Sequence, residues 1–139
     1  MTIKGKVRPT GARAEAGPTG QAEIVSATGA RITLSASPST PGYSPVDLLY
    51  AAVAGCLVQS LRIAASEMKI LDRLRRAHAE VNGRKAPDGP PRIAHIDIGI
   101  EVDGDFDEAT KVALVARAKE LCTVSNTLAG LPELVAVRR

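Results

Sequence analysis

Aromatic side chains are almost absent from this chain, which has no tryptophan, one phenylalanine and two tyrosines among 139 residues. Proteins that bind single strands of nucleic acid usually stack bases on aromatic rings and gather basic residues along one groove. Here the net charge is only +3, and the lysines and arginines are scattered along the sequence. We therefore expect no nucleic-acid partner and a core built from aliphatic residues and alanine.

Targeting signals and common enzyme motifs are also missing. The first ten residues, MTIKGKVRPT, contain no apolar signal-peptide core, which predicts a cytoplasmic location. There is no glycine-rich phosphate loop and no GxSxG motif, and the two histidines lack metal-ligand spacing, so we expect neither a cofactor nor a metal site. Only two cysteines occur, Cys56 and Cys122. In a reducing compartment such cysteines are more often free thiols, ligands or catalytic groups than a structural disulfide.

The most apolar part of the chain extends from Ser44 to Lys69. Ser44 can cap a helix, Pro45 suits the first helical position, and Asp47 stands three residues after the cap. Residues 48–65 are almost all apolar or small, but polar side chains interrupt them before they reach the ~18 to 20 apolar residues that a membrane span requires. The pattern predicts a buried core helix and no membrane partner.

The remaining patterns predict an α+β fold in one domain over residues 1–139. Before the core helix, three short strands are expected in a meander; after it come two strands with alternating apolar residues, two helices and a final strand. The expected elements are Ile3–Arg8, Gln21–Ala27, Arg31–Ser37, residues 76–82, residues 95–102, Asp105–Leu121, a short helix that ends near Gly130, and Leu134–Val137.

The two cysteines are the best candidates for chemistry, although each could simply be a small core residue. Cys56 lies within the apolar helix. Cys122 has a different setting: if a helix starts at Thr123, its unpaired amides would lower the pKa of the Cys122 thiol and favour the thiolate. Their sequence separation is far from that of a CxxC motif, so only the fold could make them a redox pair.

The segments SPVDLLYAAVAGC and LCTVSNTLAG resemble the two cysteine motifs of the OsmC/Ohr family, named for osmotically inducible protein C and organic hydroperoxide resistance protein. The matching positions are Pro45, Leu48, Ala51, Ala52, Cys56, Cys122, Val124, Ser125 and Leu128. The resemblance implies antiparallel sheets wrapped around a long buried central helix. It also implies an intertwined homodimer with active sites at the subunit interface.

The activity that the resemblance implies is a thiol-dependent peroxidase. Cys56 would attack an organic hydroperoxide, Cys122 would resolve the resulting sulfenic acid as a disulfide, and an external dithiol would reduce that disulfide. The alternative is a non-peroxidase member of the family that binds a small apolar or thiol-reactive ligand at the dimer interface.

One substitution motivates this alternative. Peroxidase members carry a glutamate directly after the helix-start proline, paired with an arginine that stabilises the thiolate, and Val46 occupies that position here. The thiolate-stabilising candidates are therefore Arg13, Arg31 and Asp47. Asp47 falls on the opposite side of a regular helix from Cys56, which favours a capping role for it. A second difference is Thr123, where the family usually has proline.

Overall fold

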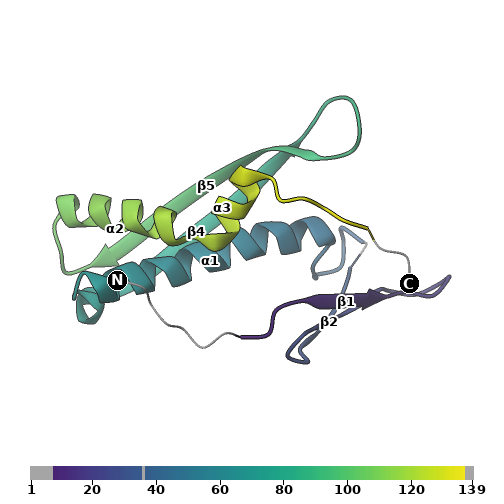
Figure 1. Ribbon diagram of the computed structural model, residues 1–139, viewed down its shortest axis with the longest axis horizontal. Helices are drawn as coiled ribbons and strands as arrows, with labels where there is room; N and C mark the ends of the chain where they lie inside the picture. The colour runs from purple at the N-terminus through teal and green to yellow at the C-terminus, as the bar shows by residue number, and fades with distance from the viewer. Residues whose placement is uncertain (1–7, 36, 137–139) are drawn as a thin grey trace. The chain divides into compact units, whose positions relative to one another are not determined.

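The computed structural model describes residues 8–35 and 37–136, and its elements follow the predicted α+β order (Figure 1). Antiparallel strands form two separate sheets, accompanied by three α-helices. The chain divides between Leu48 and Leu49 into two compact units. The elements are β1 (Ala12–Glu15), β2 (Glu23–Ser26), β3 (Arg31–Thr33), α1 (Pro45–Glu67), a 3-10 turn (Leu71–Arg73), β4 (Leu74–Lys85), β5 (Ile93–Gly104), α2 (Glu108–Leu121) and α3 (Thr123–Gly130).

The N-terminal unit contains an antiparallel meander in the order β1-β2-β3. A turn with Gly29 in the left-handed region (φ +98°) joins β2 to β3, which lie within the two strands predicted there. The first strand differs from the prediction. Arg8 has no regular structure and the rest of Ile3–Arg8 lies outside the described residues, whereas β1 begins after Gly11, whose carbonyl accepts a 2.8 Å hydrogen bond from the Ala27 amide.

Local hydrogen bonds fix both ends of α1. At its start, the Ser44 hydroxyl accepts from the Asp47 amide at 3.1 Å and the Asp47 carboxylate accepts from the Ser44 amide at 3.0 Å, a reciprocal capping box. At its end, Lys69 adopts a left-handed conformation (φ 59°) and the Ile70 amide donates to the Ala65 carbonyl at 2.9 Å. This Schellman-type arrangement satisfies the last carbonyls and ends the helix close to the predicted residue.

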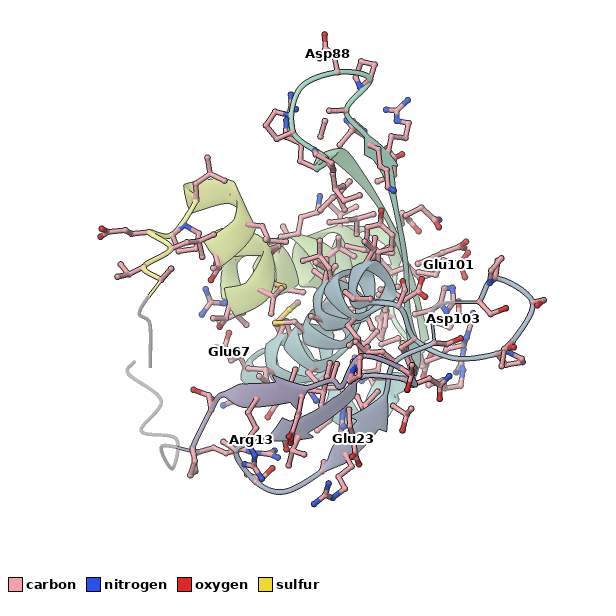
Figure 2. All side chains as sticks on the ribbon, turned by 90° about the vertical axis from the view of Figure 1, so that its right-hand side faces the viewer. Arg13, Glu23, Glu67, Asp88, Glu101 and Asp103 are labelled. Atoms are coloured by element: carbon pink, nitrogen blue, oxygen red, sulfur yellow. The ribbon has the colours of Figure 1, made fainter. Side chains whose placement is uncertain are left out.

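The C-terminal unit is built on a hairpin of two 12-residue strands, β4 and β5, which confirms both predicted strands and extends them. On the exposed face, a guanidinium nitrogen of Arg76 in β4 lies 3.3 Å from the Glu101 carboxylate and 3.6 Å from the Asp103 carboxylate, both in β5. Figure 2 shows these two carboxylates side by side. The hairpin loop carries Asp88 at its tip (Figure 2). The opposite face carries the apolar side chains that meet the helices, as period-two alternation predicts.

The core of this unit is aliphatic, as the scarcity of aromatic residues predicts. Leu61, Ala64 and Ala65 of α1 pack with Leu114 and Ala118 of α2, and all five side chains are completely buried. By length and composition alone, α1 could cross a membrane, but this row of its side chains lies in the protein core instead. One face of α1 therefore lies in the core of this unit, while Ile63 on the same helix is 43% exposed.

The end of the chain corrects one prediction. Residues 134–136 form no strand, and the Leu134 side chain is 92% exposed. Val137, the last residue of the predicted strand, lies outside the described residues. A short apolar run becomes a strand only where a neighbouring strand completes its hydrogen bonds, and none of the described strands pairs with this segment.

Candidate functional site: a thiol pair between α1 and α3

The fold brings the two cysteines together within the C-terminal unit. Cys122 is completely buried in a cluster with Val53 and Leu57 of α1, and Cys56 packs against the same cluster. The Cys56 thiol lies within hydrogen-bonding reach of the Cys122 sulfur, and both residues are free cysteines. Two cysteines far apart in the sequence therefore lie together in one local cluster.

Cys122 occupies the junction between two helices. Its extended backbone (φ −73°, ψ 97°) ends α2 and makes it the N-cap residue of α3, which begins at Thr123 as predicted. Burial tends to raise the pKa of the Cys122 thiol, but hydrogen bonding from Ser125, Cys56 and Val124 outweighs it, so the pKa lies below its ordinary value. No cap hydrogen bond of regular geometry reaches the sulfur, and the amides act on it as oriented dipoles.

Ser125 is the functional candidate that sequence reasoning missed, since it entered only as a position in a motif. Its hydroxyl donates to the Cys122 carbonyl oxygen at 3.3 Å, and hydrogen bonding from the same side chain to the Cys122 sulfur lowers the pKa of that thiol. The hydroxyl has one proton, so it can donate to only one of these acceptors at a time. An anionic sulfur is the stronger competitor because hydrogen bonds to charged acceptors are stronger. The sequence does contain a signal for this role, because Ser125 is a hydroxyl residue three positions after Cys122, the residue before the predicted helix start.

Asp47 is engaged at the start of α1. Its backbone and side-chain hydrogen bonds with Ser44 lower the pKa of its carboxyl group and keep it ionised. This arrangement is the capping role that the sequence favours. That Asp47 also stabilises a thiolate stays a prediction.

The two candidate arginines lie on the exposed surface of the N-terminal meander, where Figure 2 labels Arg13 together with Glu23. Arg31 of β3 forms an ion pair with Glu23 of β2, with an NH1–Oε1 distance of 3.1 Å. Arg13 of β1 forms no ion pair with any residue in the described ranges. The part of either arginine in activating Cys56 stays a prediction.

Histidine, cysteine and carboxylate side chains do not gather elsewhere into a metal-binding group. Among residues 8–35 and 37–136, no three of them are placed to hold one ion. His95 forms its own exposed pair with Asp97 at 2.8 Å. The thiol pair is therefore the arrangement of described residues with the most evident chemistry.

Comparisons with known proteins agree with this fold. A family model described as OsmC-like protein matches residues 36–135. An OsmC-like protein from Mycoplasma pneumoniae has a similar structure (TM-score 0.77, 19% identity), and the alignment covers 89% of each chain. No curated protein sequence matches this chain.

Two further similar structures carry functional descriptions. One is an organic hydroperoxide resistance protein OsmC, described as a predicted redox protein, from Legionella pneumophila, with a TM-score of 0.71 and 21% identity over 91% of this chain and 93% of that one. The other is the organic hydroperoxide resistance protein OhrB of Bacillus subtilis, with a TM-score of 0.67 and 23% identity over 89% and 93% of the two chains. Because the family match spans most of the sequence, this chain belongs to the OsmC-like protein family within the OsmC/Ohr group.

Proposed function

We propose that this protein is a thiol-dependent peroxidase that reduces organic hydroperoxides, with Cys56 as the nucleophile and Cys122 as the resolving residue. The observation that supports this proposal is the contact between two cysteines that the sequence separates widely. The similar structures described as organic hydroperoxide resistance proteins add support at the level of the fold. The two-cysteine route to peroxide reduction requires a thiol that meets the substrate and a second thiol within bonding reach.

Each step of this reaction balances. The Cys56 thiolate attacks the terminal oxygen of the hydroperoxide, the O–O bond breaks, and the alkoxide takes up a proton and leaves as an alcohol. The Cys122 thiolate then attacks the sulfur of the Cys56 sulfenic acid, the S–O bond breaks, and the hydroxide takes up a proton and leaves as water. An external dithiol donates two electrons to the resulting disulfide and is itself oxidised to a disulfide.

Exposure supports this assignment of the two roles. The Cys122 side chain is completely buried, whereas Cys56 is only partly buried and can meet a hydroperoxide. The hydrogen bonds that favour the Cys122 thiolate suit it to attack a neighbouring sulfenic acid. Of the two arginines, Arg13 is the better thiolate stabiliser, because Arg31 already binds Glu23.

The proposal includes an intertwined homodimer whose antiparallel sheets wrap around the α1 helices, with active sites at the interface. Its support is that only 33% of the most apolar stretch of α1 is buried within one chain, and Ile63 is 43% exposed. Light scattering should give twice the 14.5 kDa chain mass. We place the protein in the cytoplasm, where a thiol pool supplies the reductant.

Turnover of cumene hydroperoxide with dithiothreitol as reductant tests the peroxidase directly. The wild-type protein should consume peroxide, and Cys56→Ser should abolish consumption because it removes the nucleophile. Cys122→Ser should form the sulfenic acid but no intramolecular disulfide, and dimedone should trap the acid at Cys56. Undiminished turnover by Cys56→Ser would refute the proposal.

A second candidate function is the binding of a small apolar or thiol-reactive ligand without peroxidase activity. Two observations favour it: Val46 replaces the glutamate of the peroxidase members, and a cavity of about 370 Å³ lies beside the thiol cluster. Apolar residues dominate the cavity lining, which includes Val53, Ile96, Ile98 and Leu128. Val46→Glu separates the two candidate functions. If the protein is a peroxidase, the substitution should accelerate peroxide consumption. If neither the wild-type protein nor Val46→Glu consumes peroxide, the result would support the ligand-binding function.

A further inference from the structure

In a disulfide between Cys56 and Cys122, a reductant could attack either sulfur atom. The two sulfurs differ in their exposure and in their surroundings. We propose that the external thiol attacks the sulfur of Cys56, and that Cys122 leaves as a thiolate which the Ser125 hydroxyl stabilises. This inference rests on the thiol pair of the proposed function. It assigns the direction of disulfide reduction and a positioning role to Ser125.

Access to the two sulfurs gives the first argument. Cys122 is completely enclosed by the cluster that contains Val53 and Leu57, so a second molecule cannot approach its sulfur without opening the core. Cys56 is partly exposed and follows the exposed Gly55 on the same helix. Thiol–disulfide exchange depends on which sulfur the nucleophile can reach, so attack at Cys56 is favoured.

The surroundings of Cys122 give the second argument. The sulfur that leaves acquires a negative charge, and it leaves faster when its thiol has a low pKa. At the start of α3, hydrogen bonding from the Ser125 side chain and from the Ser125 and Val124 amides lowers the pKa of this thiol. In the disulfide the sulfur is uncharged, and the Ser125 hydroxyl can donate to the Cys122 carbonyl oxygen at 3.3 Å instead. As charge develops, the same proton can turn to the sulfur.

The exchange proceeds in two balanced steps. A thiolate of the external dithiol bonds to the Cys56 sulfur, the Cys56–Cys122 bond breaks, and its electron pair stays on Cys122. The second thiol of the reductant, as its thiolate, then attacks its partner's sulfur in the mixed disulfide and releases Cys56. The protein gains two electrons and the reductant becomes a cyclic disulfide.

Mapping the mixed disulfide tests the direction of attack. The protein is oxidised with diamide, which needs no hydroperoxide, then exposed briefly to glutathione and quenched with N-ethylmaleimide in denaturant, which exposes the buried Cys122 thiol. Peptide mass spectrometry should find glutathione on Cys56 and the maleimide on Cys122. Glutathione mainly on Cys122, or equally on both, would overturn the proposal even if the protein is a peroxidase. Failure of diamide to form the intramolecular disulfide would overturn the thiol pair itself.

Substitution of Ser125 tests the stabilising role. Removing a hydrogen bond to a charged group should make Ser125→Ala slow release of Cys122 by about three- to tenfold. In a Cys56→Ser background, where Cys122 is the one remaining cysteine, it should also raise the pH midpoint of the thiolate absorbance at about 240 nm. Ser125→Thr should restore both properties.

Thr127→Ala is the matched control, because its hydroxyl lies on the same helix and donates to the Thr123 carbonyl, at 2.7 Å, as its one hydrogen bond within the described part of the chain. It should change neither property. An unchanged rate and pH midpoint in Ser125→Ala, or equal changes in Thr127→Ala, would overturn the role of Ser125.

Discussion

Two guanidinium nitrogen atoms of Arg117 in α2 bind the carboxylate of Glu67, the last residue of α1. Its Nε lies 2.7 Å from Oε2 and its NH2 lies 3.2 Å from Oε1, the fork geometry that suits a carboxylate. A third nitrogen, NH1, lies 3.0 Å from the Glu120 carboxylate. This contact joins the two helices whose leucines and alanines form the core of the C-terminal unit.

The Glu67–Arg117 contact predicts a specific pH dependence of stability. The hydrogen bond from Arg117 lowers the pKa of Glu67 below its value of 4.5 in an unfolded chain. The contribution of this contact to the free energy of unfolding is therefore fully present above the pKa that Glu67 has in the unfolded chain. It is lost as the pH falls through the pKa that Glu67 has in the folded protein. In urea unfolding, Glu67→Gln should destabilise the protein at about pH 7 and have little effect at about pH 3.

Glu120→Gln provides the control for this prediction. Glu120 contacts the same arginine from within α2, one turn away, and is more exposed than Glu67. Its substitution should cost less stability, since exposed ion pairs within one helix contribute little. An effect of Glu67→Gln that is the same at both pH values would contradict the account.

Two glycines on β5 should differ in their tolerance of alanine. A Cβ atom at Gly104 would collide with the Phe106 ring and lie 2.6 Å from the Arg73 carbonyl oxygen, a backbone atom that cannot easily move. At Gly99 the nearest contact is an ordinary 3.8 Å from the Glu80 carbonyl oxygen. Thermal unfolding should show that Gly104→Ala destabilises by about 1–3 kcal/mol. Gly99→Ala should be nearly neutral, and the reverse order would be inconsistent with this packing.

The core of α2 can be tested in the same way. Leu114 is completely buried against Leu61 and Ala65, whereas Val112 on the same helix is 63% exposed. Leu114→Ala should therefore lose about 2–5 kcal/mol of unfolding free energy through lost burial and a cavity. Val112→Ala should change it by only about 0.5 kcal/mol. Comparable losses in denaturant titrations of both variants would show that α2 is placed wrongly.

The two arginine candidates can be separated kinetically. Under the proposed function, Arg13→Ala should slow the reaction of Cys56 with cumene hydroperoxide in stopped-flow measurements, because it removes a cation with no ion-pair partner among the described residues. A loss of about tenfold is expected for one charged hydrogen bond. Arg31→Ala, which breaks the pair with Glu23, should have the smaller effect. A larger loss of rate in Arg31→Ala than in Arg13→Ala would contradict the assignment and would indicate that Arg31 stabilises the thiolate.

Local signals predicted most of the helices and the long hairpin. The start of α1 depends on contacts between Ser44 and Asp47, three residues apart, and alternating residues specify β4 and β5. The strand β1 was missed because all four of its side chains are exposed and carry no apolar pattern. Its position depends on pairing with β2, which a local pattern does not contain.

The site was predictable in its residues but not in its geometry. Motif resemblance selected Cys56 and Cys122, and the helix start at Thr123 gave a reason for a low thiol pKa at Cys122. Their contact depends on how α3 packs against α1, which only the fold specifies. The Ser125 hydroxyl lies near Cys122 because α3 begins there, and it donates to the Cys122 carbonyl oxygen at 3.3 Å.

Disulfide mapping after a single oxidation tests the central claim most directly. The fully reduced protein is treated with one equivalent of cumene hydroperoxide, then alkylated, digested and examined by mass spectrometry. The account predicts one equivalent of cumyl alcohol and a peptide pair joined by a Cys56–Cys122 disulfide. Peroxide left unreduced, with both cysteines still alkylated as free thiols, would contradict it.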